Sequence, residues 1–198
     1  MGAVQIVNLV SYRVELFVLR HFRGLADVGV YSIAMQTVES MWLIAAAMAT
    51  AVTAPVVQSS EPEAARLVAR TAAKALLFTT GAAAIVAAAA PFAIPFVLGD
   101  AFEDAAVPLA LLMPGVVAYA PVTVLVVYLS VRRGRPRLSL AVSVAAGLTT
   151  LGLGLVLIPE FGVNGAAVAS SVGYAAGAVL AWVFFARLTR LRPQAAFA

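Results

Sequence analysis

Two stretches, QIVNLVSYRVELF at residues 5–17 and YSIAMQTVESMW at residues 31–42, place charged residues inside long apolar segments. Arg13 and Glu15 lie in the first stretch and Glu39 lies in the second. A charge at the centre of a membrane helix costs about 2.5–3.5 kcal/mol on insertion scales, whereas the same charge on a soluble helix costs little. The meaning of these residues therefore depends on the solvent that surrounds the chain.

The composition is that of an integral membrane protein. Of 198 residues, 63% are hydrophobic and 11% are charged, and the mean hydropathy is +1.01. An average soluble domain is about 45–50% apolar and about 25% charged, and a soluble domain of this length cannot hide so much apolar surface. The basic residues lie in clusters between uncharged runs, so we expect no binding to nucleic acid. The absence of Cys excludes disulfides and thiolate metal ligands.

Six segments are long and apolar enough to cross a bilayer, since a span needs about 20 apolar residues. They cover approximately residues 3–22, 28–57, 72–98, 105–131, 138–158 and 165–186. We therefore predict an all-α integral membrane protein in which residues 1–198 form a single domain of six transmembrane helices. Pro62 suits the first turn of the third helix, and Asp104 is expected to cap the fourth.

The distribution of Lys and Arg predicts the orientation of these helices. The connections after the second, fourth and sixth spans carry three, four and three basic residues, and those after the first, third and fifth carry two, zero and zero. Because cytoplasmic loops are rich in Lys and Arg, the connections after the second, fourth and sixth spans are expected in the cytoplasm. Both termini are then cytoplasmic, and the protein is placed in the cytoplasmic (inner) membrane.

Proline and glycine occur inside the predicted spans. Five prolines are expected to lie within helices and to kink them: Pro55, Pro91, Pro95, Pro114 and Pro121. Gly173 and Gly177 form a GxxxG pattern, which allows two helices to approach closely. In a chain this rich in Gly and Ala, we expect the pattern to serve packing within the chain.

Polar residues form a stripe on each of the first two predicted helices. At about 100° per residue, Gln5, Asn8, Tyr12 and Glu15 share one side of the first helix, and Ser32, Gln36, Glu39 and Thr50 share one side of the second. Arg13 and Glu39 each lie roughly 15 Å from a helix end, near the middle of a hydrocarbon core about 30 Å thick. Contact of these charges with lipid is therefore excluded.

Two interpretations of the stripes remain open. The functional one is a substrate cavity or an ion path, for which the candidate residues are Asn8, Tyr12, Arg13, Glu15, Gln36 and Glu39. Within it, Glu15 or Glu39 is a candidate to bind a proton or Na⁺, because burial raises the pKa of a carboxyl group. The structural one is an ion pair of Arg13 with Glu39 or Glu15 that only holds the two helices together.

No pattern in the sequence indicates catalysis. There is no nucleophile–base pair, no cluster with metal-ligand spacing and no Gly-rich phosphate loop. We therefore expect no enzyme, no cofactor and no metal site.

Several motifs, taken together, resemble the middle of polysaccharide flippases of the MATE-like superfamily. They are YRVELFVL at 12–19, VGVYSIA at 28–34, ESMWLI at 39–44, LGDAF at 98–102, AAVPL at 105–109, GRPR at 134–137 and LIPEFGVNGAAVA at 157–169. Their order and spacing match the polysaccharide transporter branch over essentially the whole chain. One departure is that Thr149, Thr150 and Gly152 precede the LIPEFGVNG motif, where family members often carry Asn.

The resemblance implies a fold and a function. Family members have about twelve helices in two six-helix lobes around a central cavity, and they flip lipid-linked oligosaccharides across the cytoplasmic membrane by alternating access. This chain is similar to the second lobe alone, and Arg13, Glu15 and Glu39 would then stand near its cavity side. A central cavity needs a second lobe, supplied by a separate chain or by a second copy.

Other functions are compatible with the same residues. One is a cation-coupled drug or metabolite antiporter lobe of the same superfamily, in which Glu15 or Glu39 is the coupling carboxylate. Another is a non-transporting membrane scaffold or a truncated remnant.

Overall fold

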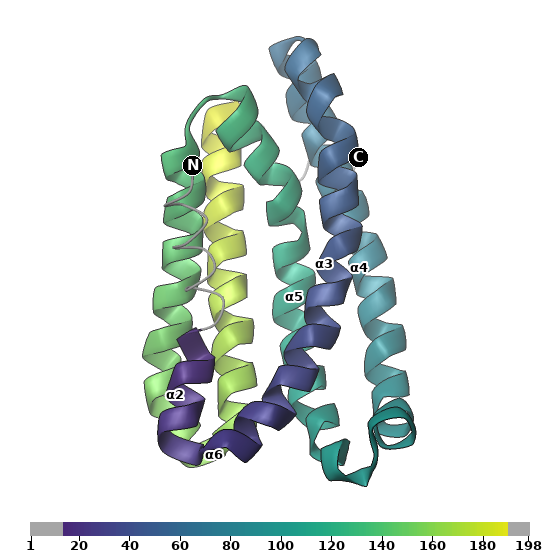
Figure 1. Ribbon diagram of the computed structural model, residues 1–198. Coiled ribbons are helices and arrows are strands. Elements are labelled where there is room, and N and C mark those ends of the chain that lie inside the picture. Colours follow the sequence, from purple (N-terminus) through teal and green to yellow (C-terminus); the bar gives the residue numbers. More distant parts are fainter. Residues whose placement is uncertain (1–13, 190–198) are drawn as a thin grey trace.

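The computed structural model of the chain describes residues 14–189, which form an all-helical bundle without strands (Figure 1). The elements, in chain order, are α2 (Val14–Arg23), α3 (Leu25–Gln58), α4 (Glu61–Leu98), the short 3₁₀ helix η1 (Asp100–Ala105), α5 (Ala106–Val126), the π-helical turn η2 (Val127–Arg132) and α6 (Pro136–Thr189). The predicted all-α class is confirmed.

Four helical segments of the described chain are long and apolar enough to cross a membrane. They are Leu25–Gln58, Glu61–Leu98, Asp100–Arg132 and Pro136–Thr189. The chain is therefore a multi-pass membrane protein by the length and composition of its helices. The predicted number of six spans stays a prediction, because the first one (3–22) lies mostly outside the described residues. The orientation of the termini also stays a prediction.

The helix α6 contains the last two predicted spans as two antiparallel arms. Its 54 residues are interrupted at Gly162, where φ is 57° and ψ is −129°. The first arm (residues 136–161) runs to this bend and the second arm (residues 163–189) returns beside it, drawn in green and yellow in Figure 1. The predicted connection at 159–164 is thus only a single non-helical residue, and Pro159 lies inside the helix.

Glycines bring the two arms of α6 into backbone contact. A Cβ atom added at Gly173 would lie 2.7 Å from the carbonyl oxygen of Ala146, and one at Gly177 would lie 3.1 Å from the Ala146 Cβ. The first distance is shorter than real Cβ contacts, and the second is tighter than most of them. The prediction that this GxxxG pattern serves packing within the chain is therefore confirmed.

The helix α4 begins before the apolar span predicted from residue 72, and Pro62 lies in its first turn as predicted. The backbone N–H and the hydroxyl of Ser60 both donate hydrogen bonds to Glu63 Oε2, at 3.0 and 2.6 Å. This capping box, with Pro62 in the first turn, starts the helix at Glu61, so only Ser59 and Ser60 separate it from α3. Polar first turns extend the helix beyond its apolar part, which hydropathy alone cannot detect.

The start of α5 differs from its prediction. Ala105 precedes its first residue, and no side chain caps the helix there. Asp104 instead lies within η1, so the expectation that Asp104 caps this helix is wrong. The 3₁₀ turn supplies i→i+3 backbone hydrogen bonds in place of a side-chain cap.

The centre of the bundle is α5. In its most apolar window, which lies within Asp100–Arg132, 61% of the residues are buried, compared with 17% in α4. The helices α3, α4 and α6 all pack against it, and the Gly115 amide donates a hydrogen bond of 2.8 Å to Ser171 Oγ on the second arm of α6. The five predicted intrahelical prolines do lie inside α3, α4 and α5.

Candidate functional site

The two ends of the bundle differ in charge. At one end, α3 ends, α4 begins and η2 turns into α6, and this basic end carries Arg132, Arg133, Arg135 and Arg137. At the other end, here the acidic end, lie Asp100, Glu103, Asp104 and Glu160, together with Arg20 and Arg23 of α2. The Arg23 guanidinium donates to the Glu160 carbonyl oxygen at 3.4 Å, so α2 is tied to the bend of α6.

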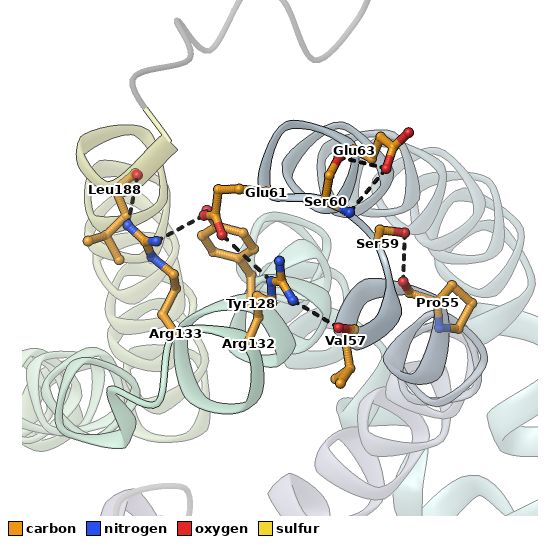
Figure 2. Close-up of polar contacts among 10 residues, drawn as sticks. All are labelled: Pro55, Val57, Ser59, Ser60, Glu61, Glu63, Tyr128, Arg132, Arg133 and Leu188. Atoms are coloured by element: carbon orange, nitrogen blue, oxygen red, sulfur yellow. Dashed lines mark hydrogen bonds and ion pairs between the residues drawn. The ribbon is translucent and has the colours of Figure 1, made fainter.

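A network around Glu61 links four elements at the basic end (Figure 2). Glu61 Oε1 lies 3.0 Å from Arg133 Nη1, and Glu61 Oε2 lies 3.6 Å from Arg132 Nε. The hydroxyl group of Tyr128 also donates a hydrogen bond to the Glu61 carboxylate. We call these four residues the Glu61 clasp.

The clasp also satisfies backbone carbonyls at two helix ends. Arg132 Nη1 donates to the Val57 carbonyl at 2.8 Å, and Arg133 Nη2 donates to the Leu188 carbonyl at 3.3 Å. The last carbonyls of a helix have no partner within the helix, and a cation at this end also interacts favourably with the negative end of the helix dipole. The clasp therefore closes the ends of α3 and α6 onto the start of α4. Sequence reasoning missed it, because its partners are far apart in the chain.

A second polar cluster is buried between α2, α3 and the second arm of α6. Glu15 is 1% exposed, and Ser170 is fully buried. The Tyr31 hydroxyl lies 3.0 Å from Ser170 Oγ and also interacts with the Glu15 carboxylate. We call Glu15, Tyr31 and Ser170 the buried polar cluster. It brings one carboxylate and two hydroxyl groups together in the apolar interior.

Polar residues also lie on the outer surface of α3. Its buried side includes Tyr31, Met35 and Val38, whereas Gln36 is exposed and Glu39 is half-buried. By the helical rise, Gln36 and Glu39 are about 16 and 21 Å from the start of a helix about 51 Å long. Both therefore lie at a depth where the hydrocarbon core surrounds a membrane helix.

Three aromatic rings pack beside this surface. The Trp42 ring centroid is 5.5 Å from that of Tyr174 and 6.2 Å from that of Tyr119, and the two tyrosine rings are 5.6 Å apart. Trp42 follows Glu39 by three residues, so both side chains lie on neighbouring parts of α3. The rings join α3, α5 and α6 near the middle of the bundle. No pattern in the sequence indicated that these three rings meet.

The predicted site residues thus fall into three groups. Asn8, Tyr12 and Arg13 lie outside the described residues. The predicted pairing of Arg13 with Glu39 or Glu15 therefore stays a prediction. Glu15 lies in the interior of the bundle. Gln36 and Glu39 lie on the outer side of α3. The structure therefore separates Glu15 from the surface that carries the other two described candidates.

The arrangement defines a class of protein, a multi-pass α-helical membrane protein with polar groups at mid-depth. Comparisons of the chain with protein-family models, with curated proteins and with solved structures find no match.

Proposed function

We propose that this chain is one lobe of a membrane transporter, similar to the second lobe of a polysaccharide flippase, and that its substrate is a lipid-linked oligosaccharide. The observation that carries the proposal is the outer side of α3, where Gln36 is exposed and Glu39 half-buried at mid-depth. Polar groups there are costly against lipid. A water-filled cavity shared with a second lobe, or with a second copy of this chain, removes that cost.

The second support comes from the motifs quoted above, which resemble the polysaccharide transporter branch in order and spacing. The charge difference between the two ends of the bundle supports an orientation. With the basic end in the cytoplasm, the helices follow the positive-inside rule. The protein then belongs to the cytoplasmic membrane, and substrate moves from the basic end toward the acidic end.

Cysteine accessibility tests the cavity directly, because the native chain contains no Cys. Single variants Gln36→Cys and Ser40→Cys, both on the exposed side of α3, are treated with a membrane-impermeant maleimide in intact cells and in inverted vesicles. The matched control is Ile85→Cys, at a position on α4 that is 71% exposed and apolar. We expect labelling at positions 36 and 40 and none at position 85. Equal reactivity of all three would refute the aqueous cavity.

Transport itself is tested with proteoliposomes that contain a fluorescent lipid-linked oligosaccharide. The protein is supplied alone and with candidate second-lobe chains from the same membrane. Glu39→Leu is expected to reduce flipping at least tenfold, whereas the control Glu160→Gln at the acidic end is expected to leave it unchanged. Loss of flipping in both variants, or in neither, contradicts the assignment of Glu39 to the transport path.

The buried polar cluster favours a second candidate, a cation-coupled antiporter lobe. A carboxylate and two hydroxyl oxygens buried together are groups that a proton or Na⁺ binds. In this alternative, Glu15→Gln abolishes the dependence of transport on a proton or Na⁺ gradient, whereas a flippase without coupling is insensitive to the gradient. If no preparation transports any substrate, the scaffold or remnant interpretation replaces both.

A further inference from the structure

A groove about 520 Å³ in volume lies on the outer surface of the bundle, and none of its lining residues belongs to α3. Its walls come from α4, through Leu76, and from the second arm of α6, and its floor comes from α5. Small residues on α5 and α6 leave the space open: Ala118, Pro121, Ala175 and Ala178. Both walls pack against α5, so the groove follows the line between two helices over a third.

The groove has the length of one membrane leaflet. Its lining on α6 extends from Ala175 to Ala186, which is about 16 Å along the helix axis. Half of a hydrocarbon core is about 15 Å thick. A single acyl chain that enters from one leaflet therefore fits along the groove with its headgroup at one end.

The polar end of the groove is basic. Val179, Val183 and Arg187 follow a four-residue step on one side of α6, so the apolar lining leads directly to an exposed guanidinium group. This end of α6 is also the end where Arg133 binds the Leu188 carbonyl. The negative charge of Glu61 there is already engaged by Arg132 and Arg133. The Arg187 guanidinium at this end of the groove therefore favours an anionic ligand.

We infer that the groove between α4 and the second arm of α6 binds one anionic glycerophospholipid, with an acyl chain along Val179 and Val183 and the phosphate at Arg187. This inference does not depend on the proposed transport function, because no residue of α3, the helix that carries Gln36 and Glu39, lines the groove. A lipid held there fills the space between α4 and α6 over the small residues of α5.

Native mass spectrometry of the full chain tests the inference. The protein is exchanged into detergent with palmitoyl-oleoyl phosphatidylglycerol or with phosphatidylcholine of the same acyl chains, and retained lipid is counted. We expect one retained phosphatidylglycerol, bound at least fivefold more tightly than phosphatidylcholine, since each basic residue near the headgroup contributes about this factor. Equal retention of the two lipids would overturn the charge selection.

Two pairs of variants locate the site. Val179→Trp fills the groove and is expected to abolish retention. Val156→Trp is its matched control, because Val156 and Val179 are both 64% exposed and lie on opposite arms of α6. Arg187→Gln is expected to remove the fivefold preference for phosphatidylglycerol, whereas Arg137→Gln, an exposed arginine at the same end, retains it.

Three further outcomes contradict the inference. Undiminished retention in Val179→Trp places the lipid elsewhere, and an equal loss in Val156→Trp means that the loss is not specific to the groove. Displacement of phosphatidylglycerol by an equimolar polyprenyl phosphate overturns the assignment to a glycerophospholipid and identifies the occupant as an isoprenoid lipid. Circular dichroism of each variant establishes that the helices have formed. We expect both Trp variants to fold, because Val156 and Val179 are exposed.

Discussion

Replacing Gly173 by Ala tests the contact between the two arms of α6. The added Cβ would lie 2.7 Å from the carbonyl oxygen of Ala146 and 3.1 Å from the backbone nitrogen of Thr150, with the Thr150 hydroxyl closer still. Two of these three neighbours are backbone atoms, which cannot rotate away. The arms must therefore separate, and overpacking of this kind typically costs about 1–3 kcal/mol.

The matched control is Gly152→Ala on the first arm of the same helix. A Cβ atom at Gly152 meets no atom within 4 Å, and Ala is a better helix former than Gly by about 1 kcal/mol. The same substitution is therefore expected to have opposite signs at the two positions. The melting temperature should fall by about 2–12 °C for Gly173→Ala and should stay equal or rise for Gly152→Ala.

The assay is thermal unfolding of the purified protein in a mild detergent, followed by circular dichroism. Adding Thr150→Ala to Gly173→Ala removes the side-chain part of the clash, so we expect partial rescue. Full rescue is not expected, because the Ala146 carbonyl remains in place. If Gly173→Ala is as stable as Gly152→Ala, the close packing of the two arms is refuted.

Two further predictions concern the ends of the bundle. Glu61→Gln removes the ion pairs with Arg132 and Arg133, whose side chains are 23% and 32% exposed. Because solvent screens such pairs, we expect the free energy of unfolding to fall by about 0.5–1 kcal/mol, and by less in high salt. Thermal unfolding at two salt concentrations measures this effect. Gly162→Ala places a Cβ atom on a backbone with φ 57°, 3.0 Å from Arg23 Nε. We expect the free energy of unfolding to fall by about 1–3 kcal/mol in the same assay. Arg23→Ala should restore only part of this stability, because the backbone strain persists.

Each of these predictions has its own control. Glu103→Gln, at an exposed position of the acidic end, should leave both the stability and its salt dependence unchanged. Gly29→Ala, at a glycine with ordinary helical φ and no atom near its Cβ position, should not destabilise the protein. A salt-independent loss in Glu61→Gln would show that the clasp does not act through charge. Wild-type stability of Gly162→Ala would contradict the positive φ angle at the bend of α6.

The membrane class and most helix positions followed from the sequence, because apolar length is a local property. A run of about 20 uncharged residues predicts a span regardless of its neighbours, and the described helices cover the predicted spans from 28–57 onward. The GxxxG pattern at Gly173 and Gly177 was interpreted correctly for the same reason, since small residues permit close approach wherever a partner helix is available.

Local patterns located one helix start and misplaced another. The start of α4 at Glu61, where Pro62 was expected in the first turn, depends on the Ser60–Glu63 capping box, and the absence of a cap at Asp104 depends on the 3₁₀ turn before α5. Both are decided by hydrogen bonds worth about 1 kcal/mol. Hydropathy, which distinguishes spans by many kcal/mol, does not detect differences of this size.

The polar contacts required the tertiary structure. A helical periodicity places Glu15 and Glu39 on a side of their own helices, but it does not say what that side meets. Only the packing of α2 against α6 puts Glu15 inside the bundle beside Tyr31, and only the exposure of α3 leaves Gln36 outside. The physical reason is range: hydropathy is a property of each residue, whereas the contact of Tyr31 with Ser170, 139 residues away in the chain, depends on how the intervening helices pack.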